Sequence, residues 1–369
     1  MPNDWFIVEN VAEIASPSLL VYPARSKANL DKVLAMTGGP ARLRPHIKTH
    51  KLAEMVQMHV AAGVTRCKAA TIAEAELAAS NGMTDVLLSY QPVGPNISRL
   101  LELIRRFPQT TFRTIIDDCS ALKNLSAAAT QADLKIPVLL DIDCGMHRTG
   151  VTPDDRAAVL YRELVKSPGI IADGLHVYDG HLHIEDLAER RRACDEGMAP
   201  VLVLFERLQG DGLPVPRIVA GGTPTFPIHA KYPARECSPG TYVFWDFGYG
   251  NRFKDLDFQL AAMLLTRVIS KPGENRLCLD LGHKAVAAEN PHPRVFFPQL
   301  PDAVAISQSE EHLVIETPRA GEFSVGDCLY GVPRHICPTV ALHGYVVVVE
   351  NGRAVNRWPV RGRERKLTI

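Results

Sequence analysis

Short apolar stretches alternate with longer amphipathic ones over the first two thirds of the chain. The short stretches are rich in Val, Ile, Leu and Thr, which is typical of strands; they are residues 18–22, 41–48, 65–71, 85–90, 110–117, 136–143, 170–179 and 217–222. The longer ones repeat apolar residues every three or four positions, the period of a helix, in residues 51–63, 71–82, 96–107, 121–132 and 154–167. This alternation predicts an α/β fold, a (β/α)8 TIM barrel rather than an open sheet.

The pattern changes near Phe247. Apolar stretches then follow one another with turn residues and little helical periodicity between them, in residues 258–270, 276–282, 312–318, 327–333 and 345–360. Asn351 and Gly352 are residues that a tight hairpin turn prefers, because both tolerate positive φ. We therefore expect a barrel domain over residues 17–246 and a C-terminal all-β domain over residues 247–369, and we expect residues 1–16 to belong to the β domain.

The composition narrows the possible partners. The chain has 41 Lys and Arg and 41 Asp and Glu, so its formal charge is zero. Nucleic acids and anionic membrane surfaces normally require an excess of basic residues, and we expect neither as a partner. The start, MPNDWFIVEN, lacks the pattern of a signal peptide, and no apolar run is long enough to span a membrane. The eight cysteines show no paired spacing and are expected to be reduced thiols of a cytoplasmic protein.

Polar residues that follow the predicted barrel strands are candidates for chemistry, because barrel enzymes place their active sites at the carboxyl ends of the strands. The segment RPHIKTHK, Arg44 to Lys51, lies at the end of the second predicted strand. Its Lys48 is either a solvated surface charge or a nucleophile in a partly dry pocket. Such a pocket would lower the pKa of the amine and allow a Schiff base with an aldehyde.

Three more polar segments follow the sixth, seventh and eighth predicted strands. Arg148 in DIDCGMHRTGV suits an anionic oxygen, although it could equally cap the barrel rim. In the segment HVYDGHLH, residues Tyr178 to His183 bring two histidines and an acid together, which suits a base or a metal. In AGGTPT, backbone N–H groups and threonine hydroxyls suit a phosphate, although the glycines could serve the turn alone.

A lysine for a Schiff base, an arginine for an oxyanion and a phosphate-binding turn on one rim suit pyridoxal 5′-phosphate. The segments RPHIKTHK, CGMHRTG, YDGH, GGTPT, ECSPGTYVFWD and PRHICPT, in this order, resemble the fold-type III pyridoxal-phosphate enzymes, specifically the D-threonine aldolase / D-serine dehydratase group. The resemblance covers nearly the whole chain. It implies a barrel of the alanine racemase type, a β domain and a homodimer.

The resemblance also implies roles for single residues. Lys48 would form the Schiff base with the cofactor, Arg148 would bind its phenolic oxygen, and Tyr178 would lie close to its pyridine ring. The cofactor phosphate would be bound by Gly221, Gly222, Thr223, Gly240 and Tyr242.

A divalent metal (zinc, manganese or magnesium) is implied beside the cofactor. His335 and Cys337 match its two protein ligands, although by spacing alone they could be a structural histidine and a buried thiol. Pro333 and Pro338 flank the pair and would stiffen its loop. A thiolate ligand favours zinc over manganese and magnesium.

These roles imply a lyase that acts on D-3-hydroxy amino acids. In a D-threonine aldolase, His181 or His183 would take the hydroxyl proton, and cleavage would give glycine and an aldehyde. In a D-serine or D-3-hydroxyaspartate dehydratase, Lys48 would take the α-proton, and the hydroxyl and then ammonia would leave. In this family His-x-Cys favours dehydratases over aldolases, whereas YDGHLH and the C-terminal RWPVRGRERKLTI are more similar to the bacterial aldolases. We favour the aldolase and retain the dehydratase as the alternative.

Two other interpretations remain. An amino acid racemase of this fold needs a tyrosine base from the β domain; Tyr330 is available, but the surrounding racemase motif is missing. A non-catalytic pyridoxal-phosphate carrier would resemble a barrel alone, and the expected β domain argues against it.

Overall fold

The protein is described from a computed structural model, and the description covers residues 5–369. The first four residues, MPND, lie outside the described part. They begin the stretch in which no signal peptide is expected, and they also begin the segment 1–16 that is expected to join the β domain. The chain forms two compact units. The barrel unit comprises Val33–Lys48, Ala53–Gly240 and Glu364–Ile369, and the sheet unit comprises Thr49–Leu52, Thr241–Arg363 and the N-terminal part up to Lys32.

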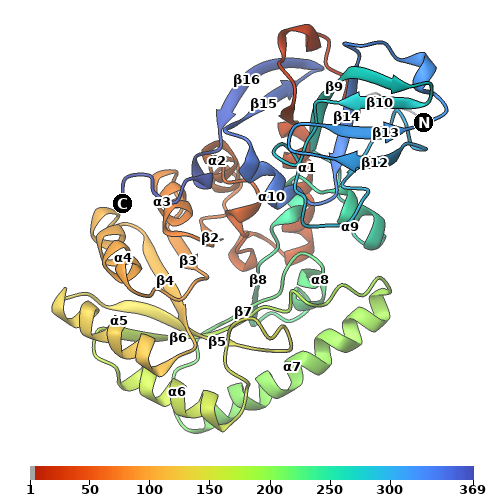
Figure 1. The fold of residues 1–369 in the computed structure, drawn as a ribbon. Coiled ribbons are helices and arrows are strands. Elements are labelled where there is room, and N and C mark those ends of the chain that lie inside the picture. Colours follow the sequence, from red (N-terminus) through yellow and green to blue (C-terminus); the bar gives the residue numbers. More distant parts are fainter. Residues whose placement is uncertain (1–4) are drawn as a thin grey trace. The chain divides into compact units, whose positions relative to one another are not determined.

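The barrel unit contains a curled parallel sheet in which strands and helices alternate (Figure 1). Its seven strands pair in chain order: β2 (Arg66–Ala69), β3 (Asp85–Leu88), β4 (Thr111–Ile116), β5 (Ile136–Ile142), β6 (Ile170–Val177), β7 (Ile218–Ala220) and β8 (Arg235–Cys237). The helices are α2 (Ala53–Ala61), α3 (Ile72–Ser80), α4 (Pro95–Arg106), α5 (Cys119–Gln131), α6 (Asp155–Lys166), α7 (Leu187–Gly210) and the short α8 (Phe226–His229). Several begin at side-chain caps, such as Thr71 for α3 and Asp154 for α6.

Residues 41–48 close the barrel, although they form no regular strand. Leu43 makes a parallel bridge to Cys237 of β8, and His46 makes one to Lys68 of β2. The Arg44 N–H donates to the Cys237 carbonyl at 2.8 Å, and the Lys68 N–H donates to the Pro45 carbonyl at 2.9 Å. This segment therefore occupies the first position of the eight-membered barrel, directly before Lys48.

Two strand predictions need correction. Residues 18–22 do form a strand, β1 (Ser18–Val21), but it pairs with strands of the sheet unit and not with the barrel. The barrel gains β8 instead, which the hydrophobic pattern did not predict because its sequence, Arg-Glu-Cys, is mostly charged. The glycine turn of residues 220–225 consequently follows the seventh barrel position and not the eighth.

Alternating positions along the strands separate two cores, because successive strand residues point to opposite faces. Residues such as Val86, Ile116 and Leu140 belong to a large core that includes the apolar faces of the helices. Leu87, Ile115, Leu139 and Val219, from β3, β4, β5 and β7, form a separate small cluster in the barrel interior.

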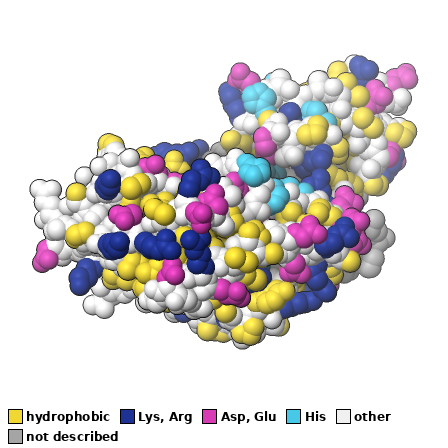
Figure 2. Space-filling view, turned by 90° about the horizontal axis from the view of Figure 1, so that it is seen from below, with side chains coloured by type: hydrophobic (Ala, Val, Ile, Leu, Met, Phe, Trp, Pro, Cys, Tyr) yellow, Lys and Arg dark blue, Asp and Glu magenta, His cyan; other side chains and the backbone are white. Residues whose placement is uncertain are grey.

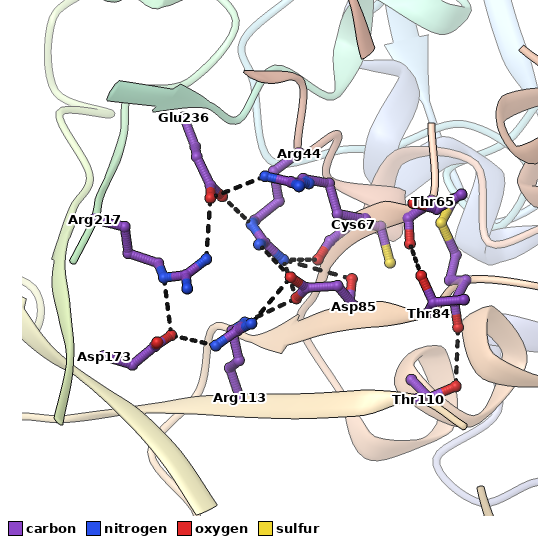
Figure 3. A network of polar contacts seen from close by, with 12 residues as sticks. Arg44, Thr65, Cys67, Thr84, Asp85, Thr110, Arg113, Asp173, Arg217 and Glu236 are labelled. Atoms are coloured by element: carbon purple, nitrogen blue, oxygen red, sulfur yellow. Dashed lines mark hydrogen bonds and ion pairs between the residues drawn. The ribbon is translucent and has the colours of Figure 1, made fainter. Parts of the chain in front are cut away.

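A closed ring of charges lies two strand positions before this interior cluster (Figure 3). Arg44 pairs with Asp85 at 2.8 Å and with Glu236 at 2.6 Å, and it is fully buried. Arg113 joins Asp85 to Asp173, and Arg217 joins Asp173 to Glu236, so acids and arginines alternate around the ring. Although burial opposes ionisation, the guanidinium groups of Arg44 and Arg113 hold the pKa of Asp85 well below its usual range. Arg44 is therefore a structural residue and is not available to bind a substrate carboxylate.

Replacing Arg44 by methionine is expected to lower the free energy of unfolding by about 3–5 kcal/mol, because Asp85 and Glu236 would remain as buried charges with fewer partners. Urea unfolding followed by circular dichroism measures this loss. Arg162→Met is the control, because it removes a surface pair with Asp211 worth about 1 kcal/mol or less. Equal losses in the two variants would contradict the role assigned to the ring.

The sheet unit contains a nine-stranded sheet with the path β12-β13-β10-β9-β1-β15-β16, while β14 pairs with β9 and β11. Besides β1, its strands are β9 (Ala262–Gly273), β10 (Arg276–Leu279), β11 (Val295–Phe296), β12 (Val304–Gln308), β13 (Leu313–Glu316), β14 (Cys328–Pro333), β15 (Tyr345–Glu350) and β16 (Arg353–Pro359). Two short helices, α9 (Phe247–Arg252) and α10 (Ile336–Leu342), accompany them, and α1 (Pro23–Thr37) runs from this unit into the barrel unit. The predicted hairpin turn is confirmed, since Asn351 and Gly352 have φ of 50° and 75° between β15 and β16.

The last six residues return to the barrel unit. Ile369 is 2% exposed and packs in the large core of the barrel. The Thr368 N–H donates to Glu76 of α3, and the Arg99 guanidinium of α4 donates to the terminal oxygen of Ile369 at 2.8 Å. This segment therefore covers the part of the barrel that α3 and α4 form.

The distribution of charged side chains, the hydropathy of the helices and the state of the cysteines can be compared with the composition. Basic and acidic side chains are interspersed on the face shown in Figure 2. Among residues 5–369, no helix combines the length and hydropathy that crossing a bilayer requires. All eight cysteines are free, as predicted; Cys67, Cys194 and Cys237 are buried, whereas Cys119 is exposed at the start of α5.

Candidate active site

Three cationic side chains of the barrel unit surround the ring of Tyr178, which follows β6. Lys48, in the 3-10 turn Ile47–Thr49, is half-buried and has its Nζ 5.9 Å from the ring centroid. The Arg148 guanidinium carbon is 5.1 Å and the Lys68 Nζ is 5.3 Å from the same centroid. The structure thus brings Lys48, Arg148 and Tyr178 together, and it adds a lysine that the sequence interpretation did not select.

The loop that carries Arg148 is shaped by an aspartate and by glycines. The Asp143 carboxylate accepts from the N–H groups of Gly145 and His147 at 2.9 and 3.0 Å. Gly145 has φ of 124°, and a Cβ there would lie 2.9 Å from the Nε2 of His181. This positive φ favours glycine at position 145.

The turn Gly221–Thr223 also lies against the ring of Tyr178. Gly221 has φ of 75°, and a Cβ on Gly222 would lie 3.0 Å from the Tyr178 ring. The Gly240 N–H donates to the Thr223 hydroxyl at 3.0 Å. This hydrogen bond connects Gly240 to the turn, so four of the five predicted phosphate residues lie together. The backbone of Gly222 lies this close to Tyr178 because glycine has no side chain.

A buried network of hydrogen bonds holds this turn in place. The Gly222 N–H donates to the Thr225 hydroxyl at 3.2 Å, which donates in turn to Asp179 at 2.7 Å. Asp179 also contacts the Nε2 of His229 at 2.8 Å. Burial would raise the pKa of Asp179, but the hydrogen bonds from His229 and Thr225 outweigh it and hold the pKa below its usual value.

The same network contains a set of metal-ligating atom types, since Cys194 lies with Asp179 and His229 in one buried group. The hydrogen-bond directions identify it as a proton-bearing network. Arg235 can only donate, and its Nη1 is 3.2 Å from the Nδ1 of His229. Nδ1 is therefore the acceptor, and Nε2 carries the proton that it donates to Asp179.

The residues around Tyr178 fit a phosphate-bearing aldehyde such as pyridoxal phosphate. The amine of Lys48 and the glycine turn are both next to the same ring. Ser238 provides an independent indication, because its hydroxyl is buried without a hydrogen-bond partner among the described residues. Its N–H donates to the Ala220 carbonyl at 3.2 Å, which places it beside the glycine turn. Sequence analysis missed Ser238, although it belongs to the quoted segment ECSPGTYVFWD.

A second group of residues was also missed. Lys68, His176 and Asp141 lie on β2, β6 and β5 and are connected by hydrogen bonds of 3.1 and 2.6 Å. Asp141 begins the segment DIDCGMHRTGV and His176 begins the segment HVYDGHLH, whereas Lys68 lies in β2, whose sequence is Arg-Cys-Lys-Ala. A charged residue at an inward strand position is the signal that could have identified them.

The two candidate bases, His181 and His183, follow Tyr178 in a short turn of the barrel unit. Both are exposed, and the His183 N–H donates to the His181 carbonyl at 3.0 Å. The geometry therefore makes both accessible to a substrate and does not select one of them.

The predicted metal ligands lie in the sheet unit, at the start of α10. The Nδ1 of His335 is 2.6 Å from Glu289, and its side chain also hydrogen-bonds to Cys337. Burial lowers the pKa of His335, but the contacts with Cys337, Asp246 and Glu289 outweigh it and raise the pKa to about 9. Since Glu289 occupies Nδ1, Nε2 is the nitrogen that would bind a metal, as is usual for histidine ligands supported by a carboxylate.

Tyr242, the remaining predicted phosphate-binding residue, is fully buried in the sheet unit. Its ring centroid is 6.0 Å from that of Phe258, and burial raises the pKa of its hydroxyl. A cavity of about 680 Å³ in the same unit is lined by aromatic residues such as Trp245, Phe253 and Phe296. None of the predicted site residues lines this cavity.

Comparison with known proteins shows which families and folds the chain is similar to. Residues 21–246 match the family "Alanine racemase, N-terminal domain", and residues 261–349 match "Putative serine dehydratase domain". The chain is 30% identical to a D-threonine aldolase of Arthrobacter sp., over 96% of this chain and 94% of that one. It is 25% identical to a D-threo-3-hydroxyaspartate dehydratase of Delftia sp., over 95% and 98%. The crystal structure of a D-threonine aldolase from Filomicrobium marinum is similar in fold, with a TM-score of 0.89, 26% identity and 96% of both chains covered.

Proposed function

Since the chain belongs to the alanine racemase-like family of pyridoxal-phosphate-dependent lyases that includes D-threonine aldolases and D-serine dehydratases, we propose that it is a D-threonine aldolase. It would cleave D-3-hydroxy amino acids to glycine and an aldehyde, with pyridoxal phosphate and a divalent metal. The observation that carries this choice is the 30% identity to an aldolase over nearly the whole of both chains, against 25% to a dehydratase.

Residues of the barrel unit would hold the cofactor. Lys48 would bind the aldehyde covalently, Arg148 would donate to the phenolic oxygen, and the turn Gly221–Thr223 with Gly240 would bind the phosphate. Tyr242 is the proposed phosphate ligand from the sheet unit. When bound, the pyridinium ring accepts the electrons of the bond that breaks at Cα. The chain's own contribution would be to orient the substrate relative to the ring.

The metal would be held by His335 and Cys337. Glu289 fixes the orientation of the His335 ring, and Cys337 lies 3.2 Å from the Thr49 hydroxyl. A thiolate and an imidazole are ligands that suit zinc. Two protein ligands leave positions for water and the substrate hydroxyl, which suits a catalytic metal. His181 or His183 would then take the hydroxyl proton.

Dehydration is the second candidate. Cys337 favours it, because within this family the His-x-Cys pair is more typical of dehydratases. In that reaction Lys48 would take the α-proton, and D-serine or D-3-hydroxyaspartate would be the substrate. A homodimer is proposed for either reaction, from the family resemblance.

Product analysis separates the candidates. The protein with added pyridoxal phosphate and zinc, manganese or magnesium is incubated with D-threonine, D-serine, D-3-hydroxyaspartate and L-alanine. We expect glycine and acetaldehyde from D-threonine, measured by chromatography and an aldehyde assay. Ammonia and an oxo acid would support the dehydratase, D-alanine from L-alanine would identify a racemase, and no product from any substrate would contradict the proposal.

A further inference from the structure

A second lysine shares the site with Lys48. Lys68 is 2% exposed, and its Nζ is 5.3 Å from the centroid of the Tyr178 ring, where the proposed cofactor would lie. It is on β2, two positions after Arg66 and on the same face of the strand. A buried lysine is costly unless it is neutral or well compensated, so its presence at this point requires an explanation.

The partner of this amine is an imidazole and not a carboxylate. The Lys68 Nζ is 3.1 Å from the Nε2 of His176, and the Nδ1 of His176 is 2.6 Å from Asp141. Asp141 accepts, so Nδ1 carries the proton and Nε2 has a free lone pair. Lys68 therefore donates to Nε2. Burial and the charge of Lys68 lower the pKa of His176, which keeps the ring neutral and suited to accept.

The charge of Lys68 is set by groups on several elements. Burial and then the charge of Lys48 lower the pKa of Lys68 to about 7, and Arg148 acts in the same direction. Asp141 on β5 and Asp179 after β6 oppose this shift. The amine is therefore protonated below about pH 7 and neutral above it, which is within the range in which cells and enzymes operate.

We propose that Lys68, held by His176 and Asp141, is a positioning residue whose charge controls how strongly the site binds its anionic cofactor. The proposal rests on the proposed function, because it requires pyridoxal phosphate to bind beside Tyr178. Protonated Lys68 adds a positive charge next to the ring and phosphate, and deprotonation removes it. Cofactor affinity should therefore fall as pH rises through the transition of Lys68, while Lys48 remains the residue that forms the covalent bond.

Two substitutions bracket the wild type. Lys68→Met represents the neutral state and Lys68→Arg the charged state, so neither can titrate near neutrality. The dissociation constant of pyridoxal phosphate is measured for the three proteins by absorbance titration from about pH 6 to about pH 9. The wild type is expected to match Lys68→Arg at low pH and Lys68→Met at high pH. The dissociation constants of the two variants should differ by a constant factor of about tenfold or more, because a charge effect of one pKa unit corresponds to about tenfold. Taking the ratio of the two constants at each pH cancels the titration of the cofactor itself.

Asp141→Asn is the test through the network. Removing its negative charge lowers the pKa of Lys68 further, so the transition in Asp141→Asn should lie at lower pH than the transition in the wild type. Circular dichroism verifies that each variant is folded; if Lys68→Met or Lys68→Arg does not fold, the shift in Asp141→Asn alone decides. A wild type that follows one variant at every pH, or an unshifted transition in Asp141→Asn, would overturn the role of Lys68. A wild type that binds no pyridoxal phosphate at any pH would instead overturn the proposed function.

Discussion

Lys48→Ala is expected to lose both the visible absorbance of a lysine-bound pyridoxal phosphate and all measurable lyase activity. The reason is that covalent capture of the aldehyde needs an amine at this point, and substrate exchange starts from that bond. Loss of a residue that forms the covalent bond typically costs several orders of magnitude in rate. Absorbance spectra of the purified protein and product formation from D-threonine measure the two effects.

Two other lysines provide the controls for this experiment. Lys123 is an exposed residue of α5 in the same unit, and Lys123→Ala should retain both the absorbance and the activity. Lys68→Arg should retain the absorbance, since Lys68 lies beside the same ring without forming the bond. If Lys48→Ala kept the absorbance and Lys68→Arg lost it, the two lysines would have the opposite roles.

Removal of the metal is expected to abolish activity and to leave the cofactor bound. A metal on His335 and Cys337 would lower the pKa of the substrate hydroxyl for cleavage, or would stabilise the hydroxide that leaves in dehydration. The Schiff-base lysine and the phosphate turn belong to the barrel unit and contain no metal ligand in this proposal. Treatment with a chelator should therefore remove activity by orders of magnitude at unchanged visible absorbance, and adding back zinc should restore it.

Variants of the ligands make the metal prediction specific. His335→Ala should reproduce the effect of the chelator and should not recover with zinc. Glu289→Gln should weaken metal binding by about 10- to 100-fold, as loss of a carboxylate behind a histidine ligand usually does; calorimetry measures it directly. Full activity of the native protein in excess chelator would refute the metal site.

The sequence allowed most of the barrel to be predicted, because strands buried on both sides are continuous apolar runs. Six predicted stretches form β2 to β7. The strand Ser18–Val21 was assigned to the wrong sheet because its residues are buried in either arrangement, and only long-range pairing with β9 and β15 decides between them. The strand Arg235–Cys237 was missed because Glu236 is compatible with the barrel interior only when the charge ring compensates it, while Arg235 on the opposite face is paired with His229.

The candidate site shows the same division. Lys48, Arg148 and the glycine turn could be predicted, since each lies in a polar segment directly after an apolar run. The contact between Lys68, His176 and Asp141 could not, because it joins three strands that are separated by up to about a hundred residues in sequence. Alternation along a strand indicates which face a side chain occupies, but not which residue meets it across the barrel.

The docking of residues 364–369 has a consequence for biosynthesis. The core of the barrel includes Ile369, and Glu76 is bonded to Thr368, yet all of Thr241–Arg363 is translated before these residues. A ribosome-bound chain that has just completed β8 therefore holds a barrel with an uncovered apolar surface near α3 and α4. Such an intermediate persists until the entire second unit has emerged, and its uncovered apolar surface exposes it to aggregation during this interval.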